Sequence, residues 1–328
     1  FRVCHSIPDS MGIAIHTPLG SIIHTGDFKV DHTPIDNHKT DFATLSRLAS
    51  EGVLLLLADS TYAEVDGYTP SESTIQSPID LKISQAEGRI IVATFASLIS
   101  RMQIVLDSAF RHNRKVAVVG RSMSNNLKMA IKIGYLNAEP NVLISLKEAK
   151  KLPANKIILL ATGTQGEPTS ALVRMSRNEH NDVNIVSGDT VILSSSPIPG
   201  NESLVAKTID DLYRLGAKVF SSRNANVHVH GHASREELKL LLNIVRPKFF
   251  IPIHGEYRHL VANAELAKLI GIKPQNTLVL ENGYVVDINS TEANTTDYIP
   301  LEQVFISGKK PWYNTCLLYT SPSPRDRG

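Results

Sequence analysis

Ten of the twelve histidines lie in two segments that are far apart in the sequence, residues 1–40 and 228–259. The long block between these segments holds only His112 and His180. Because imidazole is a common metal ligand and titrates near neutral pH, such clustering favours a functional site over scattered surface positions. We predict one site that is assembled from both ends of the chain, with a separate module inserted between them.

The block between the histidine segments alternates strand-like and helical patterns. Its apolar runs, typical of buried strands, are 89–94, 116–119, 157–161 and 190–193. Its helical stretches lie near 98–110, 123–133, 169–176 and 201–215. This rhythm is typical of a parallel α/β sheet with helices on its faces. We predict an α/β protein in which residues 71–225 form an insertion, and residues 1–70 and 226–290 form one lobe.

Three residues of the histidine-rich segments lie at the ends of predicted strands, where glycine, proline or serine frees the backbone to turn. Asp27 follows a predicted hairpin at 11–16 and 21–25, His254 ends an apolar strand, and His5 lies beside another. Histidine and aspartate are the usual ligands of catalytic zinc. Taken singly, each is more simply a partly buried histidine or a turn-forming aspartate. The combination favours a metal site.

Three loops of the inserted block are rich in glycine and hydroxyl groups, and each precedes a helix. They span 120–124, 162–168 and 194–202, and they contain Ser122, Gly163, Thr164 and Ser195. In an open parallel sheet such loops gather at the carboxyl ends of the strands, and backbone N–H groups at helix starts suit phosphate. Any one loop is an ordinary turn with a helix cap, but three on one edge favour phosphate binding.

The charge distribution is compatible with a polyanionic partner for the inserted block. Residues 71–225 carry 19 Lys and Arg against 13 Asp and Glu, whereas the whole chain carries 34 against 32. A mildly basic middle between acidic flanks fits a polyanion-binding module beside a metal-binding one, and ordinary surface scatter explains it equally well. The absence of a Walker A loop and of a dinucleotide-binding glycine motif disfavours nucleotide-cofactor folds.

Two further features bear on the cellular compartment. The chain has no apolar run of about eighteen residues or more, so we expect no membrane span. Its two cysteines are too few for a disulfide framework, and we expect a cytoplasmic protein.

Seven short segments, in order along residues 1–308, resemble the motifs of one nuclease class. Two of them, 5–10 and 25–31, resemble consecutive metal motifs of metallo-β-lactamase nucleases, and three resemble β-CASP motifs A, B and C, namely 58–64, 228–234 and 252–258. Segments 163–168 and 196–202 are similar to hallmarks of the ribonuclease J family. The resemblance implies an incomplete metallo-β-lactamase αββα lobe with an inserted β-CASP parallel α/β domain.

The resemblance also implies roles for individual residues. His5, Asp27 and His254 would bind two zinc ions, with Asp27 shared between them. Asp59, at the tip of the apolar run 53–57, would orient the site, and His232 would protonate the leaving oxygen. RNA phosphate would contact His230 and Gly231. The family often has serine where His230 stands, and the roles of His228 and His230 stay open.

The family resemblance implies a zinc-dependent ribonuclease with 5′→3′ exonuclease and endonuclease activity in RNA decay and maturation. Its substrate would be single-stranded RNA with a 5′-monophosphate, and the protein would form a homo-oligomer or a complex with a paralogue. Two alternatives are a DNA-processing β-CASP nuclease, which the form of motifs A and B disfavours, and a catalytically inactive paralogue that binds RNA and supports an active partner.

The chain departs from the family pattern at both ends. The family's first metal motif, His-x-His-x-Asp-His, is missing, and we interpret this as a truncation. With only part of the ligand set, the chain alone is predicted not to hydrolyse RNA. Residues 291–313 would begin a linker or C-terminal region, and residues 314–328 resemble translated adaptor or vector sequence.

Overall fold

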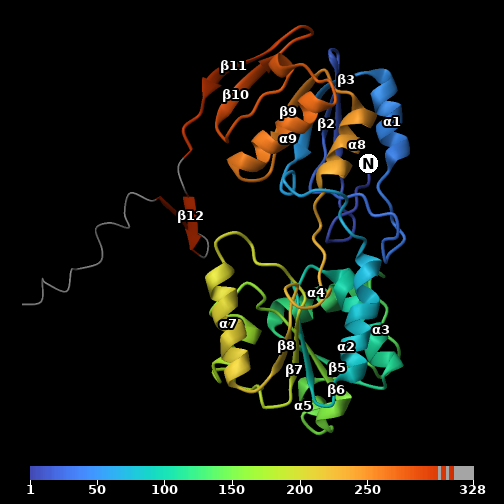
Figure 1. Ribbon diagram of the computed structural model, residues 1–328, viewed down its shortest axis with the longest axis vertical. Coiled ribbons are helices and arrows are strands. Elements are labelled where there is room, and N and C mark those ends of the chain that lie inside the picture. Colours follow the sequence, from blue (N-terminus) through green and yellow to red (C-terminus); the bar gives the residue numbers. More distant parts are fainter. Residues whose placement is uncertain (302–303, 308–309, 314–328) are drawn as a thin grey trace, which may run out of the picture.

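The computed structural model describes residues 1–301, 304–307 and 310–313, and it is mixed α/β with parallel strands in two sheets, which confirms the predicted fold class. Figure 1 shows two lobes, one above the other. The expected artefactual tail at 314–328 lies outside the described residues, as does part of the expected linker region at 291–313. Among the described residues, no helix has the length and apolar character needed to cross a membrane.

The first lobe, here called the histidine lobe, is built on a four-stranded sheet within the described part of the chain, in the order β1-β2-β3-β9. Its strands are β1 (Ile13–Thr17), β2 (Gly20–His24), β3 (Val53–Asp59) and β9 (Phe249–Ile253). The hairpin β1–β2 is antiparallel as predicted, although Gly20 belongs to the second strand and not to the turn. Strands β3 and β9 then join in parallel, so the segments that follow Asp59 and Ile253 leave the sheet side by side.

Helices pack on one face of this sheet, and a β-hairpin packs on the other. On one face, α1 (Phe42–Glu51), α8 (Arg235–Val245) and α9 (Tyr257–Leu269) pack on the side chains of Leu56 and Phe250. The neighbouring residues Leu55 and Phe249 point to the other face, because side chains alternate along a strand. They contact the hairpin of β10 (Tyr284–Ile288) and β11 (Ala293–Tyr298). Helix α8 starts after its N-cap residue Ser234.

The second lobe, here called the parallel lobe, has a five-stranded parallel sheet in the described part of the chain, in the order β5-β6-β4-β7-β8. Its strands are β4 (Ile90–Ala93), β5 (Lys115–Val119), β6 (Ile157–Ala161), β7 (Thr190–Leu193) and β8 (Lys218–Phe220). The first four correspond to the predicted apolar runs. Strand β8 was not predicted, because its three residues are too short to give a periodic pattern.

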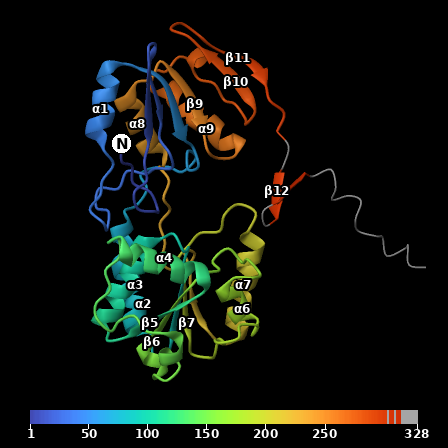
Figure 2. The same cartoon turned by 180° about the vertical axis from the view of Figure 1, so that it is seen from behind.

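Helices cover both faces of the parallel sheet (Figure 2). One face carries α2 (Gln76–Gln85), α3 (Ile99–Arg111) and α4 (Arg121–Lys132). The other carries α5 (Leu146–Ala149), α6 (Ala171–Ser176) and α7 (Glu202–Arg214). The strands are therefore buried on both sides, which explains why they read as continuous apolar runs.

The chain crosses between the lobes at residues 69–72 and again at 227–234, and a buried carboxylate fixes both crossings on the histidine side. Glu237 accepts hydrogen bonds from the backbone N–H groups of Thr69 (2.7 Å), Ser234 (2.8 Å) and Val30 (2.7 Å). Buried polar groups are stabilised only when they find such partners. One side chain thus anchors two crossings and the loop that follows Asp27.

Candidate metal centre and phosphate cavity

His5, Asp27 and His254, the predicted metal ligands, converge at one edge of the histidine lobe. The Nε2 atom of His5 lies 3.7 Å from Oδ2 of Asp27, and Nε2 of His254 lies 3.6 Å from Oδ1. Each carboxylate oxygen of Asp27 therefore faces a different imidazole. This is an arrangement in which one carboxylate can bridge two metal ions.

Local backbone geometry brings Asp27 and His254 to this edge. Gly26 has a positive φ of 62°, and a Cβ there would lie 2.7 Å from the carbonyl oxygen of Met11. Only glycine fits this tight turn, which directs Asp27 away from the hairpin. His254 has a φ of 55°, a left-handed conformation that is uncommon for a residue with a side chain. The strained turn after β9 carries its imidazole towards Asp27.

Asp59 and His232 form a second, more buried pair beside the first. Oδ2 of Asp59 lies 2.6 Å from Nδ1 of His232, and Oδ1 accepts hydrogen bonds from the N–H (3.0 Å) and hydroxyl (2.8 Å) of Thr61. Burial alone would raise the pKa of Asp59, but these hydrogen bonds and the charge of His232 hold it below its ordinary value. For His232, burial alone would lower the pKa. The hydrogen bond and the charge of Asp59 outweigh burial, so the pKa of His232 is raised.

His232 lies within reach of both groups of candidate ligands. One atom each from His5, Asp27 and His232 lie within 4.8 Å of one another, and so do atoms of Asp59, His232 and His254. The rings of His232 and His254 have their centroids 5.5 Å apart. The geometry is compatible with a metal ligand at His232 as well as with the predicted proton donor, so its role stays a prediction.

The loop 228–232 passes over His5 and orients its ring. The carbonyl oxygen of Gly231 lies 2.9 Å from Nδ1 of His5. A Cβ at Gly231 would collide with the hydroxyl of Ser6 and the ring of His5, so glycine permits this close approach. Burial lowers the pKa of His5, which favours the neutral ring. If Nδ1–H donates to the carbonyl, Nε2 keeps its lone pair towards Asp27.

His230 and His228 are neutral groups in this loop. The ring of His230 stacks on Tyr62 with centroids 3.7 Å apart and an interplanar angle of 5°. Burial lowers the pKa of His230 to about 4. Burial, followed by the charge of Arg101, lowers the pKa of His228 to about 3. Sequence reasoning did not single out Tyr62, although it lies in the motif that contains Asp59.

Two of the three predicted phosphate-binding loops line one cavity, and the third does not. Ser122, Gly163 and Thr164 line one cavity of about 590 Å³ at the carboxyl ends of β4, β5 and β6. Ser195 is buried and does not line this cavity. Gln165 joins the two loops, because its Nε2 donates to the carbonyl of Ser196 (2.9 Å) and its Oε1 accepts from the N–H of Ile198 (2.8 Å).

The lining of this cavity favours an anion. Among its described residues, the lining contains Arg121 and Arg174 against one carboxylate, Glu167, together with His180, whose pKa is lowered by burial. The predictions did not assign Arg174 and His180 to the site, since they lie on and after α6, outside the three loops. Only the packing of α6 beside the strand ends brings them to the cavity.

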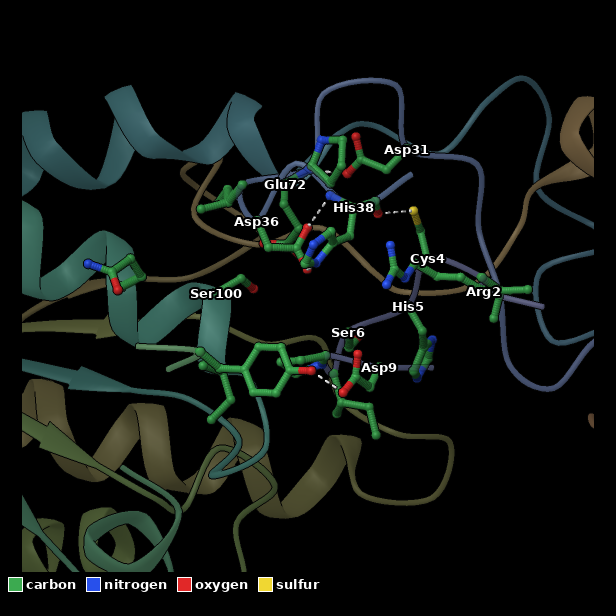
Figure 3. A pocket seen from close by; sticks show the side chains of 18 of the residues that line it. Arg2, Cys4, His5, Ser6, Asp9, Asp31, Asp36, His38, Glu72 and Ser100 are labelled. Atoms are coloured by element: carbon green, nitrogen blue, oxygen red, sulfur yellow. Dashed lines mark hydrogen bonds and ion pairs between the residues drawn. The ribbon is translucent and has the colours of Figure 1, made fainter. Parts of the chain in front are cut away.

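A second cavity of about 360 Å³ lies between the lobes beside His5 (Figure 3). Its lining mixes both signs of charge, and Arg2, Lys29, Asp31 and Asp36 all contribute. Two of its lining residues join the lobes, because the hydroxyl of Tyr135, in the parallel lobe, hydrogen-bonds to the carboxylate of Asp9, in the histidine lobe. This contact ties the lobes together close to the loop that carries His5.

Comparison with known proteins identifies two family models along the chain. One, described as "Ribonuclease J, beta-CASP domain", matches residues 87–212. The other, described as "Zn-dependent metallo-hydrolase RNA specificity domain", matches residues 221–277. The matches cover most of the parallel lobe and the return of the chain to the histidine lobe.

Similar proteins cover nearly the whole chain. A "Ribonuclease J" of Synechocystis sp. is 47% identical over 91% of this chain and 47% of its own length. A "Ribonuclease J" of Thermus thermophilus is 47% identical over 94% of this chain and 54% of its own length. A "Ribonuclease J2" of Bacillus subtilis is 42% identical over 94% and 55%, respectively. The chain thus spans about half the length of these relatives.

One solved structure shares the fold without close sequence similarity. A crystal structure of a protein of unknown function from Enterococcus faecalis V583 matches with a TM-score of 0.57 and 13% identity. The match covers 90% of this chain and 63% of that protein. At this level of identity the similarity concerns the fold alone.

Proposed function

Because the chain belongs to the ribonuclease J family, we propose that its protein is a metal-dependent ribonuclease that hydrolyses phosphodiester bonds of RNA. The observation that carries this proposal is the convergence of His5, Asp27 and His254 beside the Asp59–His232 pair. Hydrolysis at phosphorus needs a nucleophile, neutralisation of phosphate charge and a proton for the departing oxygen. The candidate ligands would hold the metal that activates the nucleophile and neutralises the phosphate, and the Asp59–His232 pair would supply the proton.

The donor set of the chain fits zinc. Two imidazole nitrogens and a carboxylate are ligands that zinc prefers, and the two oxygens of Asp27 each face one imidazole. We therefore propose a site for two zinc ions that share Asp27. When bound, zinc would polarise a phosphate oxygen and ease the deprotonation of an attacking water molecule.

His232 would supply the proton that the departing 3′ oxygen of RNA requires. Its Nδ1 is engaged with Asp59, so Nε2 is the nitrogen that remains for the substrate. Asp59 raises the pKa of His232 against the effect of burial, so more of the imidazole is protonated near neutral pH. Asp59 thus acts by orienting and charging the ring of His232.

RNA phosphates would bind in the cavity of the parallel lobe that Ser122, Gly163 and Thr164 line. Arg121 and Arg174 add positive charge there, which suits a phosphate backbone that carries no base information. We propose 5′-monophosphorylated single strands as the preferred substrate, and both 5′→3′ exonuclease and endonuclease activity in RNA decay and maturation. His230 and Gly231 would contact the phosphate nearer the metals.

We also propose a compartment and an assembly for the enzyme. It would be a cytoplasmic protein that acts as a homo-oligomer or with a paralogue. The predicted ligands His5, Asp27 and His254 are three groups, fewer than two zinc ions need. We therefore expect that the 328-residue chain by itself does not hydrolyse RNA.

The test compares this chain with the complete product of its gene. Both are purified, analysed for zinc and incubated with RNA that carries a 5′-monophosphate, a 5′-triphosphate or a 5′-hydroxyl, and with DNA of the same sequence. We expect the complete product to cleave RNA, to lose activity with a chelator and to regain it with zinc. Zinc-loaded protein that binds RNA without cleaving it would indicate an inactive paralogue. Equal cleavage of DNA would indicate a DNA-processing enzyme.

A further inference from the structure

Arg101, on helix α3 of the parallel lobe, is a fully buried cation whose helix neighbours Ile99 and Met102 belong to the apolar core. Burying a charged group is costly unless the group is paired and hydrogen-bonded. Arg101 is paired with Glu72, whose carboxylate oxygens lie 3.1 and 3.3 Å from Nη2. Glu72 itself lies on the first crossing between the lobes.

The other arm of the Arg101 guanidinium reaches two further segments. Nη1 donates to the carbonyl of Val227 (3.1 Å) and lies 3.4 Å from Nδ1 of His228, both on the second crossing. It also hydrogen-bonds to the hydroxyl of Ser194, the first residue after β7. The Ser194 hydroxyl in turn donates to the carbonyl of Val227. One side chain therefore joins three segments that are distant in sequence.

The same network continues to the loop that carries Asp27. The backbone N–H of Glu72 donates to Oδ2 of Asp31 (2.9 Å), and Asp31 pairs with the buried ammonium of Lys29 (3.3 Å). Lys29 and Asp31 follow Asp27 in one loop, and Figure 3 shows Asp31 and Glu72 beside each other. A continuous set of buried polar contacts thus links the Asp27 loop, both crossings and the end of β7.

We propose that Arg101, with Glu72, is a positioning residue that holds the loop after β7 and the histidine loop (residues 227–232) in one fixed arrangement with the Asp27 loop. The inference rests on the proposed function, since it concerns how the loop after β7 and the histidines beside the candidate metal centre are kept in register. Arginine suits this role because its rigid guanidinium holds two separate nitrogens, Nη2 facing Glu72 and Nη1 facing Val227, whereas lysine has one compact ammonium on a flexible stem.

The chain offers a matched control for this role. Arg89 lies in the same lobe and pairs with the buried carboxylate of Asp189 (Nε to Oδ1, 3.2 Å). That pair lies at the amino ends of β4 and β7, opposite to the Ser194 end. Arg89→Met removes a comparable ion pair from the same lobe without touching the crossings.

The experiment uses the complete gene product with Arg101→Met, Arg101→Lys, Glu72→Gln and Arg89→Met. We expect Arg101→Met and Arg101→Lys to lower kcat on RNA by about 10- to 100-fold with unchanged zinc content, because small misplacements of reacting groups have effects of this size. Arg89→Met should lower thermal stability and leave kcat near the wild-type value. The double variant Glu72→Gln/Arg101→Met should resemble its single variants, since the two residues act as one unit.

A second readout does not depend on nuclease activity. We expect backbone amides of 194–196 and of 227–232 to exchange hydrogen faster together in the Arg101 variants, but not in Arg89→Met. Wild-type kcat and exchange in Arg101→Lys and Glu72→Gln would overturn the inference, as would equal effects of Arg89→Met. If wild-type protein cleaves no RNA, the proposed function fails, and the exchange data still decide the role of Arg101.

Discussion

The two lobes present their functional groups in different ways. In the histidine lobe, single side chains at strand ends converge, and Asp27 faces both His5 and His254. In the parallel lobe, loops and arginines line a cavity of about 590 Å³, which we propose binds RNA phosphate. Metal ligation requires particular atoms at fixed positions, whereas phosphate binding draws on many backbone and side-chain donors.

This difference sets what mutations should do in each lobe. Loss of one side chain in the histidine lobe removes a group with no substitute, so it should affect the chemical step. Loss of one cation in the parallel lobe leaves other donors in place, so it should affect RNA affinity. The assignment of the metal site to the histidine lobe and of phosphate binding to the parallel lobe would be contradicted by the opposite result. In that case, variants of the histidine lobe would change RNA affinity and variants of the parallel lobe would change the chemical step.

The largest effect is expected for Asp27→Ala in the complete gene product. Removal of the carboxylate that faces both imidazoles should empty the metal site and lower kcat/KM by about 10³-fold or more, since metal catalysis contributes several kcal/mol. Metal analysis and RNA cleavage measure the two effects. Asp36→Ala, a change of an exposed aspartate in the same segment, is the control and should retain zinc. Full zinc content in Asp27→Ala would remove Asp27 from the ligand set.

His232→Ala should lower turnover by about 10²- to 10⁴-fold, the range typical of a lost general acid. Its zinc content should stay close to that of the wild type. The control is His16→Ala, which removes a histidine of strand β1 that contacts Ser21. If His232→Ala loses zinc, His232 is a ligand, a role that its distances to both ligand groups also permit.

Asp59→Asn should lower turnover by about 10- to 100-fold, as is usual for a residue that orients an active group. Asp59 raises the pKa of His232, so its neutral replacement should let that pKa fall. If protonated His232 is the acid, activity declines as pH rises through its pKa. The decline in Asp59→Asn should therefore occur at lower pH. An unchanged pH profile would assign the decline to another group.

The smallest effect is expected in the parallel lobe. Arg121→Ala and Arg174→Ala should each weaken RNA binding. Each should also reduce the slope of log affinity against log salt concentration by about one, because RNA binding then releases fewer counterions. Zinc content and kcat at saturating RNA should stay unchanged. Arg214→Ala, on the exposed side of α7, is the control. Loss of kcat without loss of affinity would indicate that the cavity does not hold substrate.

The strand and helix order of the parallel lobe was accessible from sequence because its causes are local. Strands that are buried on both faces must be apolar throughout, and polar loops must separate them, so β4 to β7 were predicted as runs. The start of helix α8 has an equally local cause, since Ser234 and Glu237 form a capping box within one turn. The family resemblance likewise depends on contiguous motifs.

The candidate site was predictable only as a set of residue types. The motifs identified the residues His5, Asp27, Asp59, His232 and His254. They did not show that Asp27 turns one oxygen to each imidazole, or that Asp59 contacts His232. Those relations depend on the parallel pairing of β3 with β9 and on the fold of the 228–232 loop over His5. Such contacts join residues that are far apart in the chain, where local pattern carries no information.

Sequence alone therefore determined the fold class, the order of most elements and the residue types available for a metal site. The tertiary structure alone decided that Ser195 lies away from the cavity that Ser122 lines, and that Arg174 belongs to it. It also decided that Arg101 is buried between both crossings. The reason is physical: local propensity and burial follow the chain, whereas the direction of a side chain and its distant partners follow from how the elements pack.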